Sequence, residues 1–223
     1  RYEWSKIEDE LAIDHTVYTV DLLGCGRSDK SSITYTNFVY VQMISDFIKK
    51  IIGQKTDVIA SGFSGSFVTM ACHNEKELFN KIMLVNPPSL TQLKQMPNRK
   101  DRLLKAALEI PIFGTLIYHM IVSRDNVNNL FIEKMYYNPF HVDNQMADAY
   151  YEAAHKGGCY TRFLYSSLAA KYMNINICHA LKALDNSIYI VEGETEPNGK
   201  AVTDDYCASN PAIEVSVLKE TKH

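Results

Sequence analysis

Apolar residues along the N-terminal part of the chain follow two spacings in alternation, and each spacing predicts a different element. Helical spacing, with apolar residues on one face, covers Glu3–Ala12 and Asn37–Ile52, and Gly53 stands where the second helix needs a C-terminal cap. Short apolar runs typical of buried strands lie at Thr16–Leu23, residues 57–61 and Ile82–Val85. Helix and strand in alternation predict a mostly parallel sheet with flanking helices, an α/β fold with right-handed crossovers.

The alternation stops after Pro88. From Ser89 to about Ala180 only helical patterns occur, and prolines and the Gly157-Gly158 pair break them. The helices predicted there are Arg99–Glu109, Val127–Tyr137, Val142–His155 and Tyr160–Tyr172. Strand patterns return at Ser187–Val191 and Ile213–Leu218, with a short helical stretch near Lys200–Ala208 between them. We therefore expect a core of residues 1–88 and 181–223, and a helical lid, residues 89–180, inserted over one end of the sheet.

The composition allows one substantial core. The chain has 223 residues, of which 46% are hydrophobic. A formal net charge of −3 and the lack of any Lys/Arg run give no indication of a nucleic-acid partner. The longest apolar block, Ile110–Val122, is too short to span a bilayer. The five cysteines lack metal-ligand spacing and lie in apolar or mixed patterns, so we interpret them as reduced core residues of a cytoplasmic protein.

Candidate chemistry centres on the turn Gly62-Phe63-Ser64-Gly65-Ser66. The turn joins the predicted strand at 57–61 to a helical pattern, and Ser64 stands at its apex. Gly62 and Ser66 are small, as the turn demands where strand and helix nearly collide. A strand, a tight turn and a helix in this order lift one side chain above a parallel sheet, which makes Ser64 a candidate nucleophile. An ordinary strand-to-helix turn that contains a serine is the alternative.

Four segments resemble those of the α/β-hydrolase fold enzymes. Val20–Ser28 resembles the family's D-x-x-G-x-G-x-S turn, and Gly62–Ser66 is similar to its G-x-S-x-G elbow. Ile188–Glu196 resembles the late strand whose following G-x-x-D carries an acid, and Lys219–His223 resembles the segment that carries the histidine. The resemblance extends over nearly the whole chain, and the helical block matches a lid domain.

The resemblance implies a serine hydrolase that cleaves an ester, or a related acyl or carbon–carbon bond, in a small and fairly apolar molecule. Ser64 would be the nucleophile, His223 its base, and Glu196 the acid that orients the imidazole. The N–H of Gly65 would be one donor to the oxyanion. No cofactor is implied, and no cluster such as H-E-x-x-H indicates a metal site. The alternative is a catalytically weak or inactive member that binds a small ligand or a protein partner under its lid.

The chain also departs from the family pattern. The acid position holds Glu196 where Asp is usual, and a solvated acidic loop is the alternative there, since Glu194, Asp204 and Asp205 lie nearby. In the elbow, Ser66 replaces the last glycine.

The two ends depart as well. The first strands and the loop with the second oxyanion donor belong upstream of Trp4, and the family continues beyond His223, so we expect a chain truncated at both ends. Of the other histidines, His119 is expected in the core and the rest at the surface, with a place for His155 in the pocket as an alternative. The pattern indicates no oligomeric state.

Overall fold

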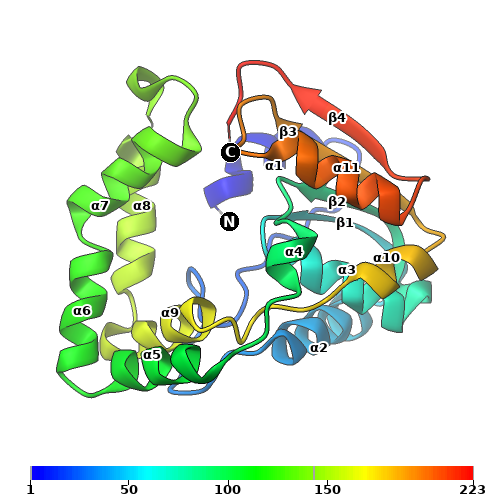
Figure 1. Cartoon of the computed structure of the whole chain (residues 1–223). Helices are drawn as coiled ribbons and strands as arrows, with labels where there is room; N and C mark the ends of the chain where they lie inside the picture. The colour runs from blue at the N-terminus through cyan, green and yellow to red at the C-terminus, as the bar shows by residue number, and fades with distance from the viewer. Residues whose placement is uncertain (1, 143, 223) are drawn as a thin grey trace.

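A four-stranded parallel sheet forms the centre of the molecule (Figure 1). The computed structural model describes residues 2–142 and 144–222. The strands stand side by side in the order in which they occur along the chain, and each pairs in parallel with the next. Their bounds are Thr56–Ser61 for β1, Phe79–Val85 for β2, Ser187–Gly193 for β3 and Glu214–Leu218 for β4. The predicted parallel α/β fold is therefore confirmed, and all carboxyl ends of the strands lie at one edge of the sheet.

Helices from both ends of the chain pack around this sheet. They are α1 (Ser5–Leu11), α2 (Asn37–Phe47), α3 (Ser64–Asn74), α10 (Cys178–Ala183) and α11 (Gly199–Ser209). A π-helical turn, Ile48–Ile52, continues α2 and ends at Gly53, whose φ of 73° is the left-handed C-terminal cap that the sequence predicted.

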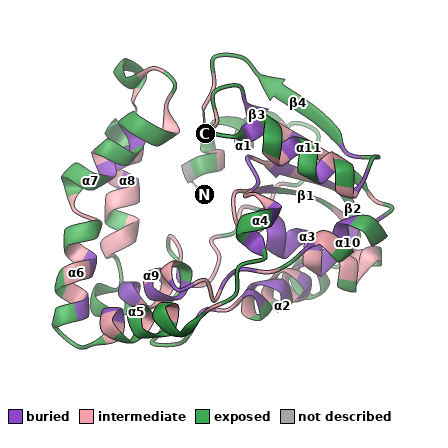
Figure 2. Ribbon diagram, in the orientation of Figure 1, coloured by how far each residue is buried: buried purple, intermediate pink, exposed green. Residues whose placement is uncertain are grey.

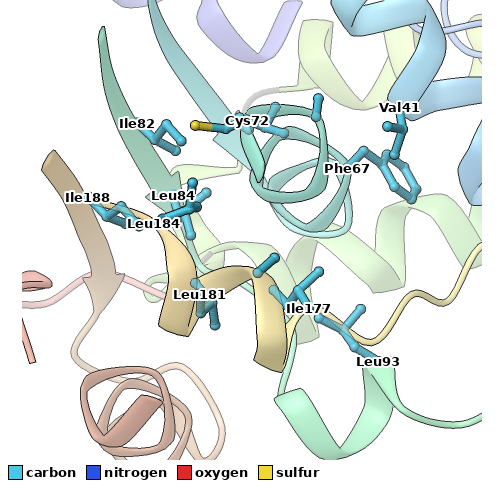
Figure 3. Close-up of a cluster of buried hydrophobic side chains, with 14 of the residues drawn as sticks. Val41, Phe67, Cys72, Ile82, Leu84, Leu93, Ile177, Leu181, Leu184 and Ile188 are labelled. Carbon is cyan, nitrogen blue, oxygen red and sulfur yellow. The ribbon is translucent and has the colours of Figure 1, made fainter. Parts of the chain in front are cut away.

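One cluster of buried side chains holds these elements together (Figure 3). Figure 3 labels Val41 on α2, Phe67 and Cys72 on α3, Ile82 on β2 and Ile188 on β3, which all turn toward a shared interior. Each is at most 8% exposed. Burial on this scale is the main favourable term in folding, so the stretch that carries Ser64 is anchored in the centre of the core.

The chain between β2 and β3 is helical. The helices are α4 (Leu90–Leu93), α5 (Arg99–Glu109), α6 (Phe113–Ile121), α7 (Arg124–Leu130), α8 (Asn144–His155) and α9 (Thr161–Ala169). A π-helical turn, Phe131–Met135, follows α7. A second, smaller cluster around Val127, Phe131 and Ala147 holds α7 to α8. Among the described helices none is long and apolar enough to cross a membrane by itself. Taken together, α5 and α6 have the necessary length and apolar composition, but they are bent by 99° at the break between them.

The strand predicted at Thr16–Leu23 is wrong. Residues 16–22 run without regular structure, and no backbone hydrogen bond joins residues 16–20 to another described segment. A groove of about 1020 Å³ separates this stretch from β1, and Val17, Tyr18 and Ile59 are among the residues that line it. A strand exists only where its backbone groups pair with a neighbour. An apolar run that meets no partner therefore stays extended without becoming a strand.

Candidate active site

The turn that carries Ser64 has the geometry that the sequence predicted. β1 ends at Ser61 and α3 begins at Ser64, so only two residues separate strand from helix. Gly62 adopts φ of 54°, in the left-handed region that glycine enters without strain. Gly65 is buried, and a Cβ atom there would lie 3.1 Å from Leu84 Cδ2. Small residues on both sides of Ser64 thus let α3 pack closely on the sheet.

Hydrogen bonds within the turn engage both the hydroxyl group of Ser64 and the backbone N–H of Gly65. The half-buried Ser64 donates from Oγ to the carbonyl oxygen of Ser61 at 2.7 Å. The N–H of Gly65, the expected oxyanion donor, points to the carbonyl oxygen of Gly62 at 3.2 Å. Ser66, the residue that replaces the elbow glycine, is fully buried and donates to Phe63 O at 2.7 Å. Both groups needed for chemistry would have to exchange a turn contact for a substrate contact.

Glu196 lies just beyond the carboxyl end of β3. A tight turn follows the strand, closed by the bond from Glu196 N–H to the carbonyl oxygen of Gly193 at 3.0 Å. The side chain is half-buried, and its Oε2 atom is shielded from solvent. Its neighbour Glu194 is exposed and accepts a hydrogen bond from the N–H of Glu220 at 3.1 Å. Of the two glutamates in the turn, Glu196 is the one held away from bulk water.

His223, the expected base, lies outside the described residues. The chain immediately before it packs along the turn that holds Glu196. The carbonyl oxygen of Thr221 accepts hydrogen bonds from Thr195, from the backbone N–H at 3.1 Å and from Oγ1 at 2.9 Å. The C-terminal segment thus reaches the same edge of the sheet as Ser64 and Glu196.

Asn86 is a site residue that the sequence reasoning missed. It follows β2 directly, adopts φ of 43°, and accepts a hydrogen bond through Oδ1 from the N–H of Gly193 at 3.0 Å. Its backbone N–H donates to Val191 O at 2.9 Å, and its Nδ2 donates to the carbonyl oxygen of Lys222 at 3.4 Å. The signal available in the sequence was an asparagine at a strand end, a residue type that tolerates the left-handed region.

Ser64 and Glu196 emerge from strands that are not neighbours. β2 lies between β1 and β3, so about 10 Å separates the axes of the two strands. The structure places both residues at the carboxyl edge of the sheet, and a hydrogen-bond relay between them needs a bridging side chain with two ring nitrogens, the role expected of His223.

Sequence comparison places the chain in a family. Residues 1–117, more than half of its length, match the family model described as alpha/beta hydrolase fold. This chain is an α/β-hydrolase fold family member. No curated protein matches it by sequence.

Solved structures of the α/β-hydrolase fold superimpose on nearly the whole chain. The 2-hydroxy-6-oxo-6-phenylhexa-2,4-dienoate hydrolase from Rhodococcus sp. strain RHA1 matches with a TM-score of 0.74 and 17% identity, covering 99% of this chain and 77% of its own. A thermophilic esterase from Thermogutta terrifontis gives 0.73 and 12%, covering 100% and 78%. A carboxylesterase from Nitrososphaera gargenis gives 0.62 and 15%, covering 91% and 71%. At these identities the likeness establishes the fold, and the neighbours include carboxylesterases and other hydrolases.

A cavity of about 580 Å³ lies in this α/β-hydrolase between the carboxyl edge of the sheet and the helical segment. Its walls come from the sheet edge at Ser61 and Asn86, from Glu3 and Trp4 near the N-terminus, from the C-terminal segment, and from side chains of the helical segment. Aromatic and sulfur-containing side chains dominate the helical wall: Met135, Tyr136, Tyr137, Met146 and Tyr150. Burial raises the pKa of Tyr150 to about 12. Ser64 lines the larger groove, and Ser61 belongs to both spaces.

A second carboxyl group, Glu192, is buried near the same edge of the sheet. It is 4% exposed, and a Cβ atom on Gly199 would overlap its carboxylate. Burial raises its pKa, the hydrogen bond from the Thr203 side chain lowers it, and the negative charges of Glu196 and Asp204 raise it further. The apolar run that predicted β3 gave no signal of a charged residue in the interior.

The other titratable residues differ in part from expectation. Among the described residues no group of three or more His, Cys, Asp or Glu side chains could hold a metal ion. His119, expected in the core, is half-buried and stacks on His155 with ring centroids 5.0 Å apart. Cys72 is a buried thiol, as expected, and burial raises its pKa to about 12. Cys159 is exposed, so the interpretation of every cysteine as a core residue is wrong for this one.

Proposed function

We propose that this protein is a serine hydrolase that cleaves an ester, or a related acyl or carbon–carbon bond, in a small and fairly apolar substrate. The observation that carries the proposal is the position of Ser64 between β1 and α3, at the carboxyl edge of a parallel sheet. There the N-terminal end of an 11-residue helix adds a positive dipole beside any oxyanion that forms.

The proposed reaction proceeds in two halves. His223 takes the proton from Ser64 Oγ as the oxygen bonds to the substrate carbonyl carbon, and the carbonyl oxygen becomes an oxyanion facing Gly65 N–H. The intermediate collapses, the leaving group departs with the proton from His223, and an acyl group remains on Ser64. In the second half, His223 takes a proton from water as the water oxygen attacks the acyl carbon. The proton then returns to Ser64 Oγ as the acid is released. Glu196 holds the imidazole in the tautomer that accepts the proton.

Residues 89–180 act in this proposal as a lid. The cavity of about 580 Å³ lies between the sheet edge and this segment, and its aromatic and methionine wall favours an apolar substrate. Ser61 lines both this cavity and the groove that contains Ser64, so a lid that closes over both spaces would exclude water from the oxyanion and strengthen its hydrogen bonds.

A fluorophosphonate probe tests the proposal directly. Intact mass spectrometry of the treated protein should show one adduct, and Ser64→Ala or His223→Ala should abolish it. Ser61→Ala is the matched control, since this serine is the last residue of β1, three positions before Ser64, and it should keep the adduct. A well-folded protein that never forms an adduct would overturn the proposal, and an adduct that survives Ser64→Ala would assign the nucleophile elsewhere.

The acid can be tested separately. Glu196→Gln keeps the size of the side chain and removes its charge, so turnover of a small ester should fall by about 10⁴-fold if the carboxylate orients the base. Asp204→Asn removes a nearby exposed charge on α11 and should leave turnover within about twofold. Equal losses in the two variants would remove Glu196 from the proposed triad.

A binding protein without catalysis is the second candidate. The hydrogen bonds Ser64 Oγ to Ser61 O and Gly65 N–H to Gly62 O favour it, because they occupy the nucleophile and the oxyanion donor. Such a protein would form no adduct with the probe and would instead copurify with a small apolar ligand detectable by mass spectrometry.

A further inference from the structure

Six large apolar side chains on α5, on α6 and at the bend between them point into solvent. They are Leu103, Ile110, Ile112, Phe113, Leu116 and Met120, here called the apolar ridge. Leu103 is 72% exposed, Ile112 77% and Met120 73%. Leu103 is on α5, and Ile110 and Ile112 are in the bend. On α6, Phe113, Leu116 and Met120 are spaced three and then four residues apart, which places them on one face of that helix. Exposed apolar side chains concentrated in one part of a protein often mark an interaction site.

The apolar ridge forms a projecting corner. α5 and α6 meet at a bend of 99°, and Figure 1 shows the corner at the lower left, at the periphery of the molecule and on the far side from β4. Ile112 at the bend adopts φ of 66°, a conformation that β-branched residues rarely enter. In Figure 2 this corner is largely exposed. A partner of this projecting apolar corner must be either deformable or shaped with a matching hollow.

Cations flank the apolar ridge on one side. Arg99, Lys100 and Arg102 in the first turn of α5 are exposed and form no ion pair with a described residue. The acidic residues of α5 are engaged elsewhere. Asp101 accepts from Lys171 Nζ at 3.3 Å, and Glu109 accepts from Lys105 Nζ at 2.6 Å. From Ile110 to Val122 the chain contains no Asp, Glu, Lys or Arg.

We propose that the apolar ridge docks on an anionic lipid bilayer, with its side chains in the boundary between headgroups and acyl chains. Arg99, Lys100 and Arg102 then lie among the anionic headgroups, which is the arrangement of amphipathic helices that bind at membrane interfaces. A fluid acyl layer accommodates a projecting corner, whereas a protein partner would need a matching hollow. The charge pattern selects anionic lipid because the exposed cations of α5 meet no competing carboxylate. The proposal is independent of the chemistry at Ser64.

Cosedimentation with lipid vesicles tests the docking. Vesicles of phosphatidylcholine mixed with phosphatidylserine should bind the protein, and vesicles of phosphatidylcholine alone should bind it at least about tenfold more weakly. The double variant Ile112→Ser/Phe113→Ser should lose about tenfold or more in affinity, since both side chains leave the acyl boundary. The triple variant Arg99→Gln/Lys100→Gln/Arg102→Gln should lose binding selectively for the anionic vesicles, and added salt should mimic it.

Phe38→Ser is the matched control. This side chain is 78% exposed on α2, so the variant removes exposed apolar surface at a place outside the apolar ridge. Its vesicle binding should equal that of the unaltered protein. Thermal melts check that all variants stay folded. Equal binding by the double variant and the control, or no binding to anionic vesicles, would overturn the proposal. So would a dimer in light scattering that Ile112→Ser/Phe113→Ser dissociates, because a second copy would then cover the apolar ridge.

Discussion

Glu192 is an ionisable residue in the interior of the protein, and we expect the free energy of unfolding to depend on pH because of it. Burial raises its pKa, and Glu196 and Asp204 add negative charge nearby. The unfolded carboxyl group ionises near its ordinary pKa of about 4.3, so it loses its proton at lower pH than the folded one. Folded protein binds more protons across this window, and stability therefore falls as pH rises through it.

Replacing Glu192 with Gln tests whether this carboxyl group lowers stability as the pH rises. At neutral pH Glu192→Gln should raise the melting temperature, because the variant keeps a hydrogen-bonding side chain and removes the carboxyl group whose ionised form burial disfavours. Below pH 4 the gain should vanish, since the native carboxyl group is then protonated in both states. Melting curves from pH 3 to pH 8 measure the difference. Glu214→Gln on exposed β4 serves as the control, and a gain of equal size there would show that general surface charge is the cause.

Gly26 shows how a single missing Cβ shapes the turn after residues 16–22. It adopts φ of 48°, and a Cβ atom there would overlap the carboxylate of Asp21, which accepts a hydrogen bond from Arg27 N–H at 3.0 Å. Gly26→Ala should lower the free energy of unfolding by about 1–2 kcal/mol for the left-handed backbone and further for the steric overlap. Chemical denaturation measures it. Gly158→Ala has a similar φ of 57° but open space around the added atom, so it should cost only the backbone part.

β1 is the element most open to unwanted pairing. It pairs with β2 on one side, and the groove lined by residues 16–22 lies on the other. An apolar edge strand with unpaired backbone groups is a template for association between chains. A polypeptide of residues 1–223 should therefore self-associate, and Ile59→Lys should reduce this by placing a charge on the edge. Light scattering against concentration measures it. Ile51→Lys changes an exposed apolar residue at the end of a helix and should have no such effect.

Comparison of three predicted strands with the structure shows what apolar spacing can and cannot specify. The runs at Ser187–Val191 and Ile213–Leu218 form β3 and β4 because each pairs with a parallel neighbour. Thr16–Leu23 has the same pattern but pairs with no strand in the described part of the chain. Spacing reports which side chains favour burial, and pairing depends on what lies beside the strand. Prediction of strands therefore fails where the partner is missing.

Helix α6 was missed for a different reason. Pro111 and Gly114 suggest breaks, yet Pro111 lies in the bend between α5 and α6, and Gly114 is buried inside the helix. A Cβ atom on Gly114 would overlap the carbonyl oxygen of Leu108, so glycine there permits close packing of consecutive helices. A glycine that breaks a helix and one that lets two helices approach look alike in sequence.

The candidate site was predictable where it depends on local order along the chain. The turn at Ser64 and the turn that ends at Glu196 are short sequences, and both lie where expected at the carboxyl edge of the sheet. Asn86 and Glu192 were not predictable, because their roles arise from contacts with distant segments, with Gly193 and Lys222 in one case and with Thr203 in the other.

Asn86 joins three parts of the molecule, the end of β2, the turn after β3 and the C-terminal segment. Asn86→Ala leaves the buried N–H of Gly193 without its acceptor and should lower the free energy of unfolding by about 1–3 kcal/mol. It should also lower turnover in the proposed reaction, because Glu196 and the residues before His223 share this support. Asn86→Asp keeps an acceptor oxygen and should recover much of the stability. Chemical denaturation measures the change in stability, and ester hydrolysis measures the change in turnover. Full activity in Asn86→Ala would show that Asn86 does not position the proposed triad.

The strand order has a consequence for how such a protein changes over evolutionary time. Consecutive strands are neighbours throughout the sheet, so residues 86–186 form one long loop between β2 and β3. The entropy lost on closing a loop grows only with the logarithm of its length, about 0.6 kcal/mol for each doubling. The sheet is therefore nearly indifferent to how many residues that loop contains. Insertions, deletions and exchanges between β2 and β3 can remodel the wall of the cavity, while the turns at Ser64 and Glu196 keep their places on an unchanged frame.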